Sequence, residues 1–114
     1  MDIRIITDTI TKEEMAEIAK EFYENMVKGV IDVENEIIAL GGEYHMDANM
    51  ILIEHGSQQN NVWGFNIYLD RDGDDWLEYV SLINIRPAVG NRSMFIENEK
   101  LCQKIKKIIS KKIK

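Results

Sequence analysis

Two stretches of alternating side chains, residues 62–69 and 77–86, enclose an acidic turn and constrain the fold more strongly than any other part of the chain. Successive side chains of a β-strand point to opposite faces, so the two stretches predict a β-hairpin. The large apolar side chains share one of its faces: Trp63, Phe65, Ile67, Leu69, Leu77, Tyr79, Ile83 and Ile85. Such a face requires helices to bury it, which indicates an α+β fold.

Helical periodicity at both ends of the chain predicts two helices that could bury this apolar face. Thr11 and Glu14 have the spacing of a capping box, and an apolar stripe follows, made of Met15, Ile18, Ala19, Phe22 and Met26. We expect this helix to end near residues 25–28. A second stripe, made of Leu101, Ile105, Ile108 and Ile109, predicts a helix that starts near residues 96–98. Both helices should pack on the apolar face of the sheet.

The middle of the chain is rich in β-branched residues. Residues 27–33 and 37–40, separated by an acidic turn, predict another hairpin. Gly41-Gly42 then resembles a bulge, and we expect strands at residues 43–46 and 50–54, with a helix over residues 47–55 as the alternative. The whole is predicted to be one domain, residues 1–114, with an antiparallel meander of four to five strands between two helices.

The second face of the 62–86 hairpin mixes apolar side chains with amides, a phenol and a guanidinium. Such a surface is typical either of a ligand pocket or of the centre of a contact between two copies of the chain. Both remain open from the sequence.

Arg86 and Arg92 flank a turn set by Pro87 and Gly90, although the chain has only four arginines against ten lysines. A guanidinium group binds carboxylates, phosphates or backbone carbonyls through paired N–H groups. The two arginines therefore either bind an anion or hold the loop in place through carbonyls and nearby glutamates. The candidate ligand-binding residues are Asn66, Tyr68, Asn84, Arg86, Asn91 and Arg92.

Glu43, His45 and Asp47 recur at every second position and would share one side of a strand. Carboxylate and imidazole groups so placed could bind a divalent metal or share a proton. Their Cα atoms would be about 6.5 Å apart per pair, so a common ion needs a bend. The alternative is a solvated strand edge. The sequence indicates no cofactor and contains no catalytic motif, so an enzyme is the less favoured interpretation.

Charge and composition exclude several classes. The net charge is −6, yet residues 100–114 contain seven lysines and no acid. Lysines stabilise a helix C-terminus, and this stripe lacks the aromatic residues that stack on bases, which argues against a nucleic-acid partner. The chain has no apolar run of membrane-spanning length and no signal peptide pattern. Its single cysteine, Cys102, cannot form an internal disulfide, so we expect a cytoplasmic protein.

Three segments resemble a known family: GGEYHMD at residues 41–47, WGFNIY at residues 63–68, and INIRP with GNRS within residues 83–93. They are similar to a bacterial and archaeal family of small proteins classed as a domain of unknown function. The similarity is closest over residues 27–93 and looser in the flanking helices. It implies a small cytoplasmic domain, with no activity, cofactor or catalytic residue.

The sequence as a whole predicts a small binding module. The mixed sheet face and the arginine-bearing loop would engage a small anionic ligand or a protein partner. One alternative is a homodimer without a ligand site. The other is a metal-dependent enzyme that uses Glu43, His45 and Asp47.

Overall fold

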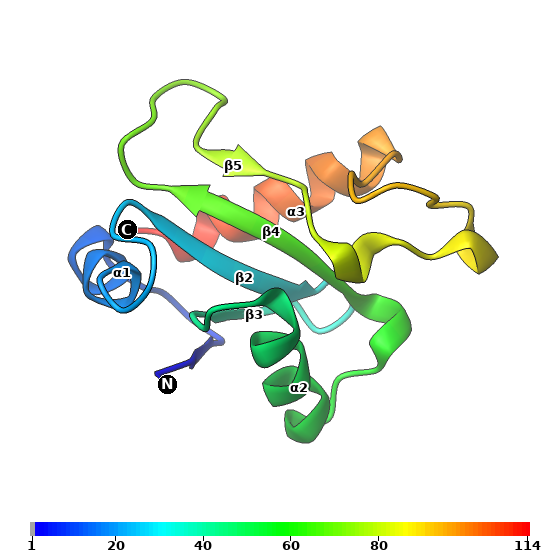
Figure 1. The fold of residues 1–114 in the computed structure, drawn as a ribbon, viewed down its shortest axis with the longest axis horizontal. Coiled ribbons are helices and arrows are strands. Elements are labelled where there is room, and N and C mark those ends of the chain that lie inside the picture. The colour runs from blue at the N-terminus through cyan, green and yellow to red at the C-terminus, as the bar shows by residue number, and fades with distance from the viewer. Residues whose placement is uncertain (1) are drawn as a thin grey trace.

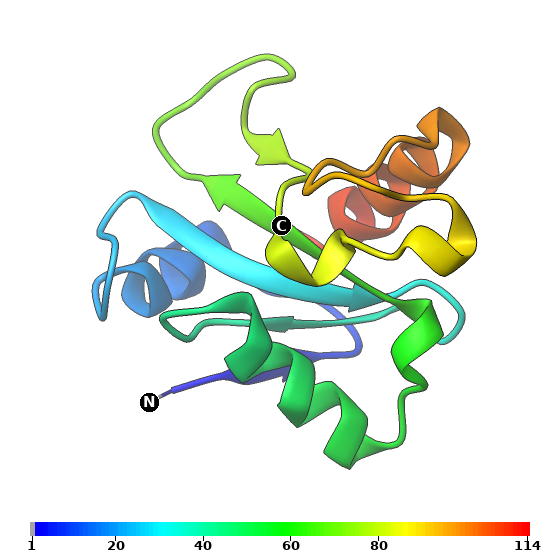
Figure 2. The same cartoon turned by 45° about the vertical axis from the view of Figure 1, so that its right-hand side comes forward.

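The computed structural model describes residues 2–114 and contains a five-stranded antiparallel sheet with helices on both faces (Figures 1 and 2). The strands, in the order β1-β3-β2-β4-β5 across the sheet, are β1 (Arg4–Ile6), β2 (Met26–Asp32), β3 (Ile37–Leu40), β4 (Val62–Tyr68) and β5 (Leu77–Glu78). The helices are α1 (Lys12–Ala19), α2 (His45–His55) and α3 (Glu99–Lys112), with 3₁₀ turns η1 (Gln59–Asn61), η2 (Leu82–Asn84) and η3 (Pro87–Val89). The predicted α+β class is confirmed.

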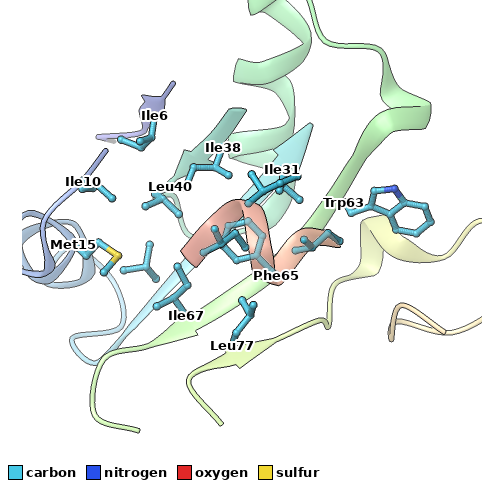
Figure 3. Packing of buried hydrophobic residues seen from close by; sticks show 14 of the residues in the cluster. Ile6, Ile10, Met15, Ile31, Ile38, Leu40, Trp63, Phe65, Ile67 and Leu77 are labelled. Atoms are coloured by element: carbon cyan, nitrogen blue, oxygen red, sulfur yellow. The ribbon is translucent and has the colours of Figure 1, made fainter. Parts of the chain in front are cut away.

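The main core lies between one face of the sheet and the two terminal helices. Phe65 of β4 is fully buried at its centre, with Ile105 of α3 and Met15 of α1 in the same cluster. Figure 3 shows side chains from β1, β2, β3 and β4 converging around Phe65. The prediction that both terminal helices pack on the apolar face is therefore confirmed.

Helix α1 is shorter than predicted. The capping box is present, because the Glu14 N–H donates to Thr11 Oγ1 and the Thr11 N–H donates to Glu14 Oε1, each at 3.1 Å. The helix ends at Ala19, however, and the chain turns through Glu24, whose φ is 63°. Met26, expected on the helical stripe, begins β2 instead.

The strands predicted at residues 43–46 and 50–54 are wrong, and the alternative of a helix over residues 47–55 is confirmed, since residues 45–55 form helix α2. Gly41 and Gly42 adopt φ values of 120° and 91°, which turn the chain out of β3. The Asp47 carboxylate then accepts the Glu43 and Tyr44 N–H groups and fixes the first turn of the helix. The alternation was misleading because this helix is apolar on its exposed side as well.

Helix α2 packs on the second face of the sheet, opposite α1 and α3 (Figure 2). Its Ala48 and Leu52 form a small second core with Val30, Ala39 and Val62. The favoured sequence prediction, two strands, placed no helix on this face. It is this helix that turns the mixed sheet surface into the wall of a pocket.

The predicted hairpin of residues 62–86 is confirmed at its start and wrong beyond Glu78. Strand β5 pairs with β4 only at Ile67–Leu77 and Asn66–Glu78. The chain then leaves the sheet through an isolated bridge between Val80 and Phe95 and forms η2. Ile83 consequently packs against the second core, and Ile85 is 42% exposed, so neither joins the main core.

The strand order also departs from a simple meander. Strand β1, which was not predicted, pairs with β3 at one edge, and β2 lies between β3 and β4.

Among residues 2–114, none of the helices combines the length and the apolar character that a membrane span requires.

Candidate ligand-binding site

A pocket of about 450 Å³ opens on the second face of the sheet, between the first turn of α2 and the η2 segment. Three of its polar lining residues come from three different elements, with Lys28 on β2, His45 on α2 and Asn66 on β4. The remaining lining residues are Tyr44, Met46, Val80, Ser81, Leu82, Ile83 and Met94. A polar floor is thus surrounded by a largely apolar wall.

The η2 wall can approach β4 because residue 64 is glycine. A Cβ atom built at Gly64 would lie 2.5 Å from the Cβ of Ser81 and 3.2 Å from Ile83. A contact of 2.5 Å essentially never occurs in proteins, so any side chain at residue 64 would push the η2 segment outward. Gly64 therefore helps to set the width of the pocket.

His45 is the most buried titratable group of the pocket, with 7% of its surface exposed. Its Nε2 lies 2.9 Å from the Phe65 carbonyl oxygen and 2.8 Å from Asn66 Oδ1. Both neighbours are acceptors, so Nε2 carries the proton and Nδ1 carries the lone pair in the neutral ring.

The Nδ1 atom of His45 forms no hydrogen bond with residues 2–114. Since the described residues contain no buried side-chain nitrogen or oxygen without a partner, Nδ1 must be accessible to solvent. Burial is the main cause that lowers the pKa of His45, and the nearby charge of Lys28 lowers it further. The ring is therefore a neutral hydrogen-bond acceptor at neutral pH.

Asn66 connects His45 to two further polar residues. Its Nδ2 donates to Glu78 Oε1 at 2.8 Å and to the Val80 carbonyl at 3.3 Å, which fixes the amide with Oδ1 toward His45. The Tyr68 hydroxyl donates to the same Glu78 oxygen at 3.0 Å. A continuous chain of hydrogen bonds therefore runs from Tyr68 through Glu78 and Asn66 to the imidazole.

Lys28 supplies the positive charge of the pocket. Lys28 of β2 lies opposite Asn66 of β4 in the register of the two strands, and its Nζ lies 5.3 Å from the centre of the Tyr23 ring. Within the part of the chain that the structure describes, the ammonium group forms no ion pair and no hydrogen bond. It is half-buried and is available to an anion that enters the pocket.

Asn84 and Arg86, two of the predicted ligand-binding residues, bond to the backbone of the 60–64 segment instead. The Asn84 amide, which is fully buried, bonds to both the N–H and the C=O of Gly64. The Arg86 guanidinium donates to the Asn60 and Val62 carbonyls and lies 4.5 Å from the centre of the Trp63 ring. Neither side chain lines the pocket.

Asn91 and Arg92, two further predicted ligand-binding residues, lie in the loop that follows Arg86. Asn91 Nδ2 donates to the carbonyls of Asn84, Ser93 and Phe95. The Arg92 N–H donates to Glu97 Oε2 at 2.8 Å, and its side chain is exposed away from the pocket lining. Of the six predicted residues, only Asn66 lies in the pocket wall, with Tyr68 attached to it through Glu78.

The three candidate metal ligands are not brought together. Asp47 caps α2, and His45 turns its Nε2 toward Asn66, while the carbonyl oxygen of Glu43 accepts the Tyr23 hydroxyl. Over residues 2–114, no three His, Cys, Asp or Glu side chains are placed to hold a metal ion. The common strand face that motivated this site is absent because the chain bends at Glu43 and helix α2 begins at His45.

Sequence reasoning missed Lys28 and the apolar wall from Tyr44, Met46 and Met94. One signal was present, because Lys28 is the only charged residue between Met26 and Ile31, in an otherwise apolar strand. A charge in a central strand usually points to a partner or a cavity. The apolar wall depends on α2 and η2, which the strand predictions did not place there.

Comparisons with known proteins give one match. The family model described as "Protein of unknown function (DUF5674)" matches residues 4–112, nearly the whole chain. No curated protein and no solved structure matches the chain. The family match confirms the resemblance noted in the sequence and adds no activity.

Proposed function

We propose that this chain, which belongs to the DUF5674 family of proteins of unknown function, is a binding module that holds a small anionic ligand in the pocket between α2 and η2. The observation that carries the proposal is the pairing of an unneutralised ammonium group, on Lys28, with an accessible acceptor nitrogen, on His45, in one pocket. A few convergent polar groups inside an apolar wall are typical of small-molecule sites.

The two polar groups define the ligand. An anionic group, carboxylate or phosphate, would bind Lys28, and an N–H or O–H on the same molecule would donate to His45 Nδ1. Tyr44, Met46 and Leu82 would cover its apolar part, since all three line the pocket and are at least 50% exposed. In this proposal, the loop that carries Arg86 and Arg92 supports the pocket wall and does not contact the ligand.

The test is a titration of ¹⁵N-labelled protein, followed by NMR, with three related probes. Lactate carries both a carboxylate and a hydroxyl, propionate lacks the hydroxyl, and lactamide lacks the charge. We expect lactate to shift the signals of Lys28, His45 and Asn66 at the lowest concentration. Each missing group should cost about fivefold in affinity, the equivalent of about 1 kcal/mol.

Matched variants locate the interaction. Lys28→Gln should abolish the advantage of lactate over lactamide, whereas Lys104→Gln, an equal charge change on the exposed side of α3, should preserve it. The proposal is wrong if a panel of small hydroxycarboxylates and phosphomonoesters leaves the pocket signals unmoved. It is equally wrong if Lys28→Gln binds them as the unmodified chain does.

A second candidate function is self-association through exposed apolar side chains, two of which, Met46 and Leu82, also line the pocket. Met46, Met50, Leu82 and Phe95 are 50%, 56%, 70% and 61% exposed, and flexible methionines are common at interaction surfaces. On the mixed face of the 62–86 hairpin, Val62, Val80 and Leu82 are the apolar residues that suggest such a contact from the sequence. Leu82 is exposed, whereas Val62 is buried and Val80 half-buried, so the two valines cannot form its centre. Sedimentation should then detect a dimer that Met50→Glu dissociates, and a monomer at tens of micromolar contradicts it.

A cytoplasmic location also belongs to the proposal. It is supported by Cys102, the one cysteine of the sequence, which has no partner cysteine in the chain with which to form a disulfide. Fractionation of the source cells, with detection by antibody, should recover the protein in the soluble cytoplasmic fraction. Recovery from a membrane or an exported fraction would contradict it.

A further inference from the structure

A second pocket, of about 560 Å³, lies on the opposite side of the sheet, where α1 and the end of α3 meet the loop between β4 and β5. Its floor is aliphatic, with Met15, Ala16, Ile67, Leu69 and Ile113 in the lining, and Trp76 closes one side. This volume is within the range of small-molecule sites.

Two cations lie in the lining of this pocket, Lys12 and Arg71. The Arg71 guanidinium carbon lies 3.6 Å from the centre of the Tyr68 ring, which positions the group while leaving its N–H donors unused. Among residues 2–114 neither cation forms an ion pair or a hydrogen bond. Asp72, also in the lining, offsets one of the two charges, so the lining is net positive on a chain of charge −6.

We propose that this second pocket binds an amphipathic anion, an aliphatic carboxylate whose chain occupies the floor and whose head group is bound by Lys12 and Arg71. The aliphatic floor would bury the alkyl chain and remove its apolar surface from water. The carboxylate would remain at the open side, where the guanidinium can donate two parallel hydrogen bonds. The site is separate from the pocket of the proposed function and depends on none of its residues.

The probes are octanoate and 1-octanol, which share the alkyl chain and differ in the charged head. Titration of the full ¹⁵N-labelled chain with octanoate should shift the signals of Ala16, Leu69 and Trp76 in a saturable manner. The alcohol should shift the same signals with lower affinity. Each cation should contribute about fivefold to the difference, as expected for exposed ion pairs of up to about 1 kcal/mol.

Three variants test the parts of the proposal separately. Lys12→Gln with Arg71→Gln should reduce octanoate affinity to that of octanol and leave octanol unchanged. Lys104→Gln with Lys107→Gln, which removes the same charge from the exposed side of α3, should change neither. Ala16→Phe, at a half-buried position of α1 that lines the pocket, should weaken both probes, with circular dichroism confirming the fold.

Equal affinity for octanoate and octanol, or an octanoate affinity that survives the removal of both cations, would overturn the proposal. So would saturable shifts confined to Lys28, His45 and Asn66, which would place the alkyl carboxylate in the other pocket. Because the two pockets have no lining residue in common, the failure of one site leaves the result for the other intact.

Discussion

The side chain of Asn84 pairs with the backbone of Gly64 as a neighbouring strand would. Its Oδ1 accepts the Gly64 N–H at 2.8 Å, and its Nδ2 donates to the Gly64 carbonyl at 3.1 Å. Strand β5 has already left the sheet at this point, so the edge of β4 would otherwise hold unpaired polar groups. One buried amide thus replaces a strand and lets η2 fold over the pocket.

Replacement of this amide should be costly. Asn84→Ala leaves the N–H and C=O of Gly64 without partners in a buried position, and we expect a loss of about 2–4 kcal/mol in the free energy of unfolding. Urea denaturation of the variant and of the unmodified chain measures this loss of stability. The control is Asn60→Ala, which removes an exposed amide and should change stability by less than about 0.5 kcal/mol. Similar losses in both variants would contradict the role of Asn84.

Arg86 should act on stability through its guanidinium geometry rather than its charge. It donates to two carbonyls and stacks on Trp63, and a lysine cannot reproduce that arrangement. We expect Arg86→Lys to lower the free energy of unfolding by about 1–2 kcal/mol. Arg92→Lys, in the same loop with an exposed side chain, should have almost no effect. An unchanged urea denaturation midpoint for Arg86→Lys would show that these hydrogen bonds contribute nothing to stability.

Asp32 should make the fold sensitive to acid. Burial alone would raise its pKa, but hydrogen bonds from Ser57, Asn35 and the Glu34 N–H prevail and place the pKa below its ordinary value. A group whose pKa is lower in the folded state stabilises above its unfolded pKa, about 3.9, and loses that contribution as the pH falls through the folded pKa.

Asp32→Asn should therefore be less stable at pH 7 by about 1–3 kcal/mol and should lose less on acidification. Chemical denaturation at a series of pH values from 7 to about 2 measures both effects. Asp8→Asn, which changes an exposed carboxylate at the start of the chain, is the matched control. Parallel pH profiles for the unmodified chain and Asp32→Asn would refute the assignment.

The parts of the fold that follow from local periodicity were predictable. The capping box at Thr11 and the buried alternation of Trp63, Phe65 and Ile67 depend on residues close in sequence, and the structure agrees with both. Helix α2 was mistaken for strands because its exposed side carries Met46 and Met50. Its buried side includes the polar residues His45 and Asn49, so apolar side chains do not recur along this helix with a 3.6-residue period.

The candidate site was less predictable because it is made by long-range contacts. Arg86 and Asn91 have the residue types of an anion site, yet both are used to bond carbonyls of their own loop and of the neighbouring strand. Lys28 and His45 become neighbours of Asn66 only through strand pairing and the packing of α2. Sequence spacing carries no information on such adjacency.

His45 should also make stability depend on pH near neutrality. Its pKa is lowered in the folded state, mainly by burial, so the unfolded chain binds the proton more readily. The contribution is complete above the unfolded pKa of about 6.5 and is lost as the pH falls toward the folded value. We expect His45→Gln to flatten the stability profile between about pH 7 and 5, and His55→Gln, at the exposed end of α2, to leave it unchanged.

The most direct test of the binding pocket is an NMR measurement of the two ring nitrogens of His45 at pH 7, before and after addition of lactate. The account predicts a neutral ring with its proton on Nε2, and a change at Nδ1 on binding that requires about fivefold more lactate in Lys28→Gln. A charged imidazolium, a proton on Nδ1, or ring signals that no small hydroxycarboxylate moves would contradict it.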